Sequence, residues 1–173
     1  VVNLAGYVDH SKKNKTMKSH FNGCKNLANF FLNKNLKKFV QIGSSIEYGK
    51  SRSPQKENKK NLRETYSTYG NAKLFSTKFL LELKKKYNFP ITILRLYLVY
   101  GPKQDVNRLI PFTIINALKK VKFNCSAGKQ LRDFVYIDDL INAIVKTFKN
   151  EKSNGEIINV GSGNPISVKK LII

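Results

Sequence analysis

The chain has 173 residues, 41% of them hydrophobic, and a formal net charge of +21 at pH 7. This length can bury one good core or two small ones, and no apolar run approaches the roughly 18 residues of a membrane-spanning helix. Two cysteines, Cys24 and Cys125, are too few for a disulfide framework or a metal cluster. We therefore expect a cytoplasmic protein with no bound metal and no membrane partner.

The excess of lysine has two interpretations. An anionic partner, such as nucleic acid, a membrane surface or a phosphorylated ligand, would attract it. The alternative is compositional, because Lys, Asn, Ile, Phe and Tyr are all used heavily, as in proteins from AT-rich genomes. The lysines are scattered along predicted helix faces without interleaved aromatic residues. We therefore expect no nucleic-acid partner and keep a small phosphorylated ligand open.

The first hundred residues alternate between strand and helix patterns. In chain order we predict strand 1–6, helix 17–35, strand 36–45, a polar loop 48–61, helix 67–88 and strand 89–101. The strands are nearly continuous hydrophobic runs, as a parallel sheet covered on both faces requires. This order predicts an α/β fold with a partial doubly wound, Rossmann-like parallel sheet.

The pattern changes after Pro102, so we place a soft domain boundary near residue 101. Beyond it we predict helix 108–120, a short strand 121–125, a strand or turn and then a helix in 132–150, strand 155–163 and a helix from 165. We expect 102–173 to form a small, partial C-terminal lobe. The strand near 156–161 can rejoin the main sheet.

Polar, small or aromatic residues follow three predicted strands, in "LAGY" (4–7), "GSSIEYG" (43–49) and "LYLVYG" (96–101). In a doubly wound sheet such strand ends line one crevice. The helix between the second and third strands opens with Tyr69 and Lys73. Residues four apart share a helix face, so both side chains can point into that crevice.

This pair has a known chemical use. A free tyrosine, with a pKa of about 10, is a poor base at pH 7, but a nearby lysine ammonium favours the phenolate. The phenolate can then take a proton from an alcohol while hydride leaves the same carbon. A serine hydroxyl from the neighbouring strand end can hold the substrate oxygen.

Five blocks now carry a resemblance: "GSSIEYG", "YGNAK", "LRLYLVYGP", "RDFVYIDD" and "INVGSG". Together, and in this order, they resemble the extended short-chain dehydrogenase/reductase family, in its NAD-dependent sugar-nucleotide epimerase/dehydratase branch. The resemblance implies NAD or NADP as cofactor, a nucleotide-diphosphate sugar as substrate, and a homodimer when the protein is full length. It also implies that 1–101 is the C-terminal part of an NAD(P)-binding domain and 102–173 part of a substrate-binding lobe.

The resemblance assigns roles to particular residues. Tyr69 would be the catalytic base and acid, and Lys73 its partner and ribose contact. Ser44, four residues before Tyr48, would hold the substrate, with Ser45 as second choice. The remaining implied positions are Ala5, Gly6 and Tyr7 along the cofactor, Arg132 at the substrate diphosphate and Arg108 near the nucleotide. Arg132 could instead form an ion pair with Asp133 or Asp139.

The sequence also departs from the family. No Gly-x-x-Gly-x-x-Gly motif follows a first strand, so we expect an excised piece of a longer enzyme that binds NAD poorly by itself. Leu98 and His20 stand where many members have Asn. We expect neither His20 nor His10 to act as a ligand or base.

The family's dehydratases carry an acidic pair directly after the serine or threonine, where this chain has Ser45 and Ile46. Glu47 comes one residue late, and on a strand that shift reverses the face. We therefore favour a 4-epimerase or ketoreductase and keep a dehydratase as the alternative. From another class, a non-catalytic nucleotide- or RNA-binding module or an inactive fragment stays open.

Overall fold

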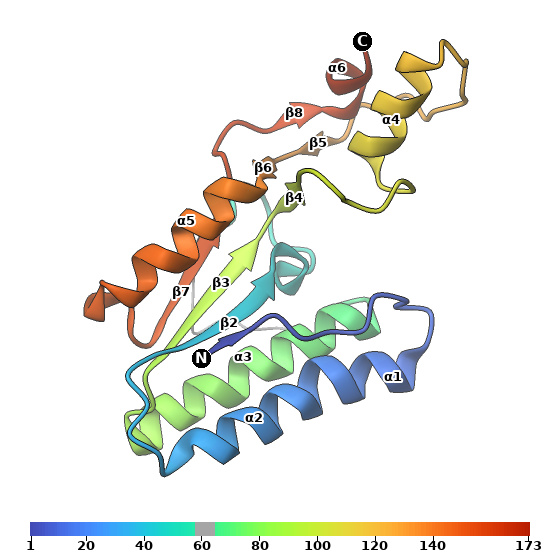
Figure 1. Cartoon of the computed structure of the whole chain (residues 1–173). Helices are drawn as coiled ribbons and strands as arrows, with labels where there is room; N and C mark the ends of the chain where they lie inside the picture. Colours follow the sequence, from blue (N-terminus) through green and yellow to red (C-terminus); the bar gives the residue numbers. More distant parts are fainter. Residues whose placement is uncertain (58–64) are drawn as a thin grey trace. The chain divides into compact units, whose positions relative to one another are not determined.

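The computed structural model describes residues 1–57 and 65–173, so part of the predicted polar loop 48–61 lies outside it. The chain forms two compact units (Figure 1). The first comprises Val1–Leu96 and Ala143–Val160, and the second comprises Tyr97–Asn142 and Gly161–Ile173. The segment Ala143–Val160 belongs to the first unit, so it divides the sequence of the second unit into two parts.

A four-stranded parallel sheet forms the centre of the first unit, in the order β1-β2-β3-β7. Its strands are β1 (Val2–Asn3), β2 (Phe39–Ser44), β3 (Ile91–Leu96) and β7 (Glu156–Val160). Most residues of β2 and β3 are buried, which explains their continuous apolar sequence. The predicted parallel α/β sheet is confirmed.

The first strand is shorter than the predicted segment 1–6. It ends at Asn3, whose side-chain oxygen accepts a hydrogen bond from the backbone N–H of Ala5 at 3.2 Å. The same side chain donates to Oε1 of Gln41 in β2 at 2.8 Å. An asparagine side chain that accepts a hydrogen bond from the backbone N–H two residues later forms a local turn. This turn takes the chain out of the sheet after β1.

Helices on one side of this sheet bury its apolar core (Figure 1). They are α1 (Lys13–Met17), α2 (Gly23–Leu32) and α3 (Thr68–Tyr87), with a π-helical segment, Lys18–Asn22, joining α1 to α2. The core contains Phe39, Ile91 and Ile93 from the sheet. Cys24 lies in the same core, as a free and buried thiol.

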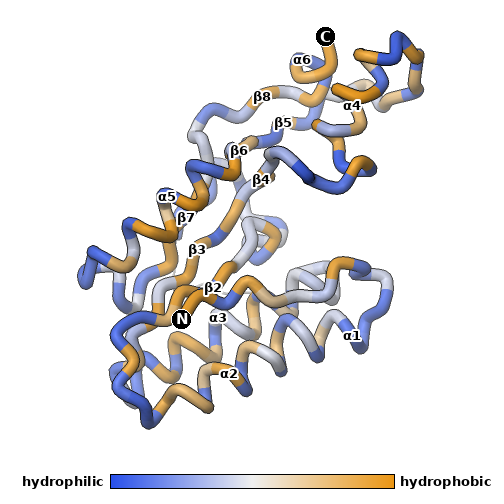
Figure 2. Tube along the Cα trace, in the orientation of Figure 1, coloured by the Kyte–Doolittle hydropathy of each residue, from blue (hydrophilic) through white to orange (hydrophobic). Residues whose placement is uncertain are grey.

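The second unit holds two small strand pairs. Strand β4 (Leu98–Tyr100) pairs in parallel with β6 (Phe134–Tyr136), and β5 (Leu131–Arg132) pairs antiparallel with β8 (Ile166–Ser167). Its helices are α4 (Leu109–Leu118) and α6 (Val168–Ile172), while α5 (Ile137–Phe148) continues into the first unit. Helix α4 is hydrophobic along most of its length (Figure 2).

Two predictions in this region were wrong. The apolar segment 89–101 is two strands, because β3 ends at Leu96 in the first unit and β4 begins at Leu98 in the second. The segment 121–125 forms no strand. None of the helices in 1–57 and 65–173 is long and apolar enough to cross a membrane.

Candidate functional site

Tyr69 and Lys73 lie together near the start of α3. Ser67 caps this helix, since its hydroxyl accepts a hydrogen bond from the N–H of Gly70 at 2.9 Å. The Nζ atom of Lys73 is 5.8 Å from the centroid of the Tyr69 ring. The structure thus brings the predicted Tyr/Lys pair together on one helix face.

Lys73 also connects α3 to the sheet. The residue is only 6% exposed, and its ammonium donates a hydrogen bond to the carbonyl of Ile42 in β2 at 2.8 Å. Burial lowers the pKa of Lys73, and the negative charge of Glu47 partly opposes this. The lysine therefore joins Tyr69 to the strand that ends at Ser44.

Ser44 is the last residue of β2, and Ser45 opens the 3₁₀ turn Ser45–Tyr48 that follows. The Ser44 hydroxyl accepts from the N–H of Ile46 at 3.4 Å, and its N–H donates to Glu47 Oε1 at 2.8 Å. Both serines are half-buried. The structure therefore shows Ser44 as the cap of this turn, and its contact with substrate stays a prediction.

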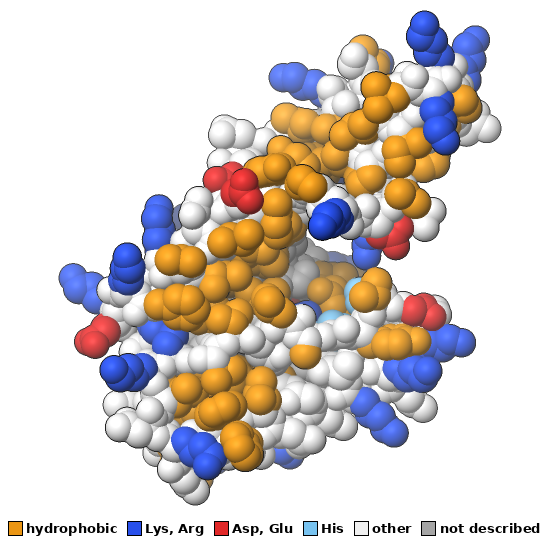
Figure 3. Space-filling view, in the orientation of Figure 1, with side chains coloured by type: hydrophobic (Ala, Val, Ile, Leu, Met, Phe, Trp, Pro, Cys, Tyr) orange, Lys and Arg blue, Asp and Glu red, His pale blue; other side chains and the backbone are white. Residues whose placement is uncertain are grey.

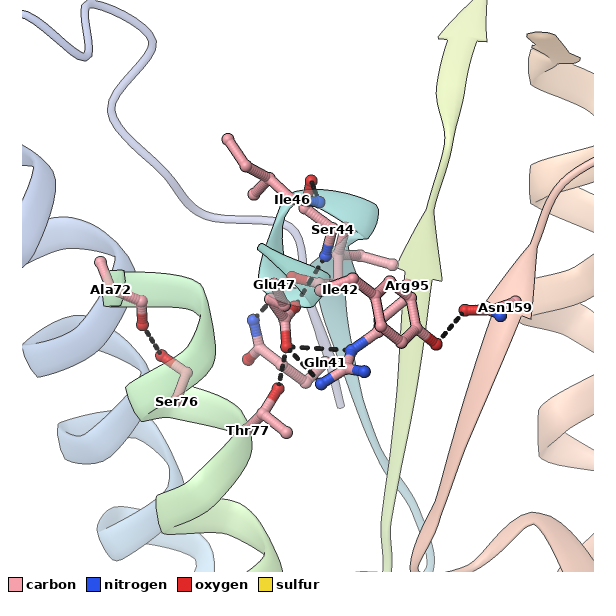
Figure 4. A network of polar contacts seen from close by, with 11 residues as sticks. Gln41, Ile42, Ser44, Ile46, Glu47, Ala72, Ser76, Thr77, Arg95 and Asn159 are labelled. Atoms are coloured by element: carbon pink, nitrogen blue, oxygen red, sulfur yellow. Dashed lines mark hydrogen bonds and ion pairs between the residues drawn. The ribbon is translucent and has the colours of Figure 1, made fainter. Parts of the chain in front are cut away.

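Glu47 points into the core rather than into a crevice (Figure 4). Its Oε2 atom accepts from the Thr77 hydroxyl at 2.7 Å and from Arg95 Nε at 3.1 Å. We expected its orientation from strand alternation, which was the wrong basis, because Glu47 lies in the 3₁₀ turn. A carboxylate bound in this way is not available for acid/base chemistry on a substrate.

Tyr48 also holds the 3₁₀ turn Ser45–Tyr48 in place. The guanidinium of Arg95 lies 4.5 Å from the centroid of the Tyr48 ring. The Tyr48 hydroxyl donates to the side-chain oxygen of Asn159 in β7 at 2.7 Å (Figure 4). Contacts with β3 and β7 thus fix the segment that carries Ser44.

The predicted cofactor residues lie in the loop after β1. Ala5 and Gly6 are exposed, and Tyr7 is half-buried. The Tyr7 backbone is held by the π-helical segment, since its N–H donates to Ser19 Oγ at 2.9 Å and its carbonyl oxygen is 3.1 Å from His20 Nε2. This loop is therefore ordered against the helix that precedes α2.

Two histidines contact Tyr69, which we did not predict. The His10 ring stacks on the tyrosine ring with centroids 3.9 Å apart, and the His20 ring meets it edge-on at 5.0 Å. Burial and then the Lys73 ammonium lower the pKa of His20 to about 4. The sequence contained one signal, because His20 occupies a position where many family members have Asn.

Arg108 and Arg132 lie in the second unit, and both are exposed. Arg108 is the N-cap of α4. Arg132 donates to the carbonyl of Leu131 at 2.8 Å, and within the described residues it forms no ion pair with Asp133 or Asp139. The alternative structural ion pair is therefore not supported.

A pocket of about 350 Å³ lies in the second unit. It is lined by Tyr100, Ile110, Thr113, Ile114, Phe134, Asn164, Ile166 and Leu171. Arg132 is paired with Ile166 in the β5–β8 ladder, and Arg108 begins the helix that supplies Thr113. The Thr113 hydroxyl is buried and has no hydrogen-bond partner among the described residues. Tyr100 and Asn164 add polar side chains to an otherwise mostly apolar wall.

The model of the NAD dependent epimerase/dehydratase family matches residues 1–161. The chain belongs to this family. The "uncharacterized UDP-glucose epimerase YtcB" of Bacillus subtilis is 31% identical over 135 residues, which cover 78% of this chain and 42% of that protein. The human dTDP-D-glucose 4,6-dehydratase is 30% identical over 138 residues, covering 79% and 39%.

Solved structures of the family share the fold. The UDP-glucuronic acid 4-epimerase of Bacillus cereus, solved in complex with NAD, aligns with a TM-score of 0.83 and 28% identity over 98% of this chain and 56% of that one. The chain spans about two fifths of the length of the two curated epimerase/dehydratase relatives described above. Within 1–57 and 65–173, no cluster of His, Cys, Asp and Glu is suited to a metal ion.

Proposed function

We propose that this chain contributes the catalytic residues of an NAD(P)-dependent sugar-nucleotide epimerase or ketoreductase. One observation carries the proposal: Lys73 is buried beside Tyr69 and bonds the carbonyl of Ile42, two residues before Ser44. A lysine is costly to bury, and here it lies within reach of a tyrosine ring at the carboxyl end of a parallel strand. In doubly wound sheets ligands bind at that end.

The residues fit the nicotinamide part of a dinucleotide. Lys73 supplies a cation and hydrogen-bond donor for ribose hydroxyls, and the exposed backbone at Ala5 and Gly6 offers a surface without large side chains. When bound, the cofactor accepts a hydride from a sugar carbon and returns it. The family description and the relatives solved with NAD favour NAD, and NADP is the alternative.

The protein's own part is proton transfer. In this proposal Tyr69, as phenolate, takes the proton of the sugar hydroxyl at the carbon that loses hydride, and returns it when the carbonyl is reduced. The Lys73 ammonium favours the phenolate. The hydroxyl of Ser44, or of Ser45, orients the sugar oxygen.

Features of the second unit support the proposed substrate class. A nucleotide-diphosphate sugar presents a flat base and two phosphates, and guanidinium groups match phosphate oxygens in a bidentate way. We assign the base to the pocket beside Thr113, the diphosphate to Arg132 and the nucleotide to the neighbourhood of Arg108. The relatives described above are named for UDP and dTDP sugars, which supports this class.

Glu47 favours an epimerase or ketoreductase over a dehydratase. Elimination of water needs an acid and a base besides the tyrosine, and the two positions after Ser44 hold Ser45 and Ile46. The carboxylate that comes next in the sequence, that of Glu47, is buried and bound to Arg95 and Thr77.

We further propose a homodimer in the cytoplasm, with the exposed Phe30 of α2 as one interface residue.

The test is turnover by the whole protein with NAD or NADP and a panel of UDP-glucose, UDP-glucuronic acid and dTDP-glucose. Tyr69→Phe should abolish turnover and leave cofactor affinity within a few-fold, while Tyr66→Phe, at a neighbouring exposed tyrosine, is the matched control. Near-full activity of Tyr69→Phe would refute the mechanism. If no sugar is turned over and a salt-dependent RNA affinity survives Tyr69→Phe, Lys73→Ala and Ser44→Ala, the protein is a binding module instead.

A further inference from the structure

The chain has only two histidines, and both contact the ring of Tyr69. His10 comes from the loop between β1 and α1, and its ring plane is inclined by 13° to that of the tyrosine. His20 comes from the π-helical segment and meets the tyrosine at 73°. Tyr69 is thus bordered by an imidazole on one face and by another at its edge.

The hydrogen bond of His20 determines its tautomer. Its Nε2 atom lies 3.1 Å from the carbonyl oxygen of Tyr7, and a carbonyl oxygen can only accept, so Nε2 must carry the proton. The imidazole is neutral, since burial and Lys73 lower its pKa to about 4. Nδ1 is then a bare acceptor, buried and without a hydrogen-bond partner among the described residues.

His20 holds the loop that carries His10. A Cβ on Gly6 would lie 2.2 Å from Cε1 of His20, so the imidazole occupies the space that only a glycine leaves open. Ser19 accepts from the N–H of Tyr7 at 2.9 Å, next to the His20 contact with the Tyr7 carbonyl. Ser19 and His20, which are adjacent in the π-helical segment, therefore fix both the N–H and the carbonyl group of Tyr7. Such segments frequently occur at functional sites.

The loop reaches His10 three residues later through a local turn. The Asp9 side chain accepts from the N–H and hydroxyl of Ser11, at 3.1 and 2.6 Å, and the Lys12 N–H donates to the Asp9 carbonyl. This turn holds the backbone on both sides of His10. A chain of contacts thus runs from His20 through Tyr7 and the turn to the face of Tyr69.

We infer that His20 and His10 are positioning residues for Tyr69. His20, as the neutral Nε2–H tautomer, locks the loop, and His10 then restricts the tyrosine ring to one plane. This inference rests on the proposed function for its catalytic consequence, because a phenol that acts as base must keep its oxygen at hydrogen-bond distance from the sugar hydroxyl. Its structural part stands without any turnover.

Imidazole NMR tests the structural part directly, because a ¹⁵N-labelled chain gives signals from two histidines and His20→Asn identifies each. We expect His20 to show the neutral Nε2–H pattern down to about pH 5, and His10 ring protons to be shifted upfield by the tyrosine ring. That shift should persist in Tyr69→Phe and disappear in Tyr69→Leu. An Nδ1–H tautomer for His20, or a His10 shift unaffected by Tyr69→Leu, would overturn the inference whether or not Tyr69 is the base.

Kinetics of the whole protein, with UDP-glucose as probe, test the catalytic part. We expect His10→Ala and His20→Ala to lower kcat by roughly 10- to 100-fold, as misplacement of a reacting group does, with KM changed less than kcat. His10→Phe keeps a flat ring and should recover part of the loss, whereas Lys13→Ala, at an exposed residue of α1, should match wild type. Unchanged kcat in His10→Ala, with Tyr69→Phe inactive, would refute positioning and leave Tyr69 as the base.

Discussion

Glu47 and Arg95 form an ion pair inside the core, with Oε2 and Nη2 3.1 Å apart and side chains 0% and 1% exposed. The pair joins the 3₁₀ turn after β2 to the neighbouring strand β3, and Thr77 adds α3 through its hydroxyl. Three elements that surround the candidate site are thus tied at one carboxylate. We attribute the fixed position of Ser44 to this network, because Ser44 also donates to Glu47.

The first prediction concerns the stability of this pair. Arg95→Met leaves a buried carboxylate without its charge partner, and Glu47→Leu leaves a buried guanidinium. Each should lower the free energy of unfolding by about 3–5 kcal/mol. The double variant should cost less than the sum of the two, because no unpaired charge remains.

Urea unfolding of the chain measures these differences, with Glu82→Gln, an exposed glutamate of α3, as control. The control should lie within about 0.5 kcal/mol of wild type. Additive losses in the double variant would show that the two side chains do not act as a pair.

The second prediction concerns pH and His20. The folded chain holds the pKa of His20 at about 4 instead of its usual 6.5, because burial and Lys73 disfavour the charged ring. Between these pH values the unfolded chain therefore binds more protons than the folded chain. The free energy of unfolding should fall as the pH drops from about 6.5 towards 4, and below pH 4 the contribution of His20 no longer changes. Tyr69, His10 and Lys73 all face the ring, and none is a carboxylate that could offset the charge.

Unfolding of wild type and His20→Asn at pH 7 and pH 5 isolates this contribution. Wild type should lose about 2 kcal/mol more than the variant over this range. Equal losses in both proteins would show that His20 titrates at its ordinary pKa in the folded state.

Most of the fold could be predicted, because its elements follow hydrophobic periodicity. Apolar strands such as 36–45 and the striped helix 67–88 are specified by their own residues. The end of β1 could not be, because the side chain of Asn3 bonds to Gln41, 38 positions away. The division of 89–101 into two strands was missed for a similar reason, because both halves are apolar. They differ only in their partners, since β3 pairs with β2 and β7 whereas β4 pairs with β6.

The candidate site was predicted where a local pattern carries it. Tyr69 and Lys73 are four residues apart on one helix, so their proximity follows from helix geometry. His10 and His20 reach the same tyrosine from a loop and a π-helical turn, and no short-range spacing indicates that. The inward orientation of Glu47 depended on a 3₁₀ turn that strand alternation does not describe.

The third prediction concerns the two thiols. Burial raises the pKa of Cys24 to about 11, and its Sγ donates to Gln41 Oε1 at 3.1 Å. Cys125 is exposed. Because the thiolate is the reactive form, a thiol reagent at pH 8 should modify one cysteine rapidly in the folded chain and two in urea. Cys125→Ser should remove the rapid phase, and Cys24→Ser should keep it. Rapid modification of Cys24 in the native chain would contradict its burial.

The fourth prediction concerns the contact between Gly6 and His20. An added methyl group in Gly6→Ala would lie 2.2 Å from Cε1 and 2.8 Å from Nδ1 of the imidazole, so the ring or the loop must move. Overpacking of this kind costs about 1–3 kcal/mol of folding free energy. Removing the imidazole makes room, so the same substitution should cost much less in a His20→Ala background.

Urea unfolding of the two single variants and the double variant measures this coupling, and Ala5→Gly, at the exposed preceding residue, controls for the loop's backbone freedom. If Gly6→Ala costs the same with and without His20, the imidazole does not occupy the space beside Gly6.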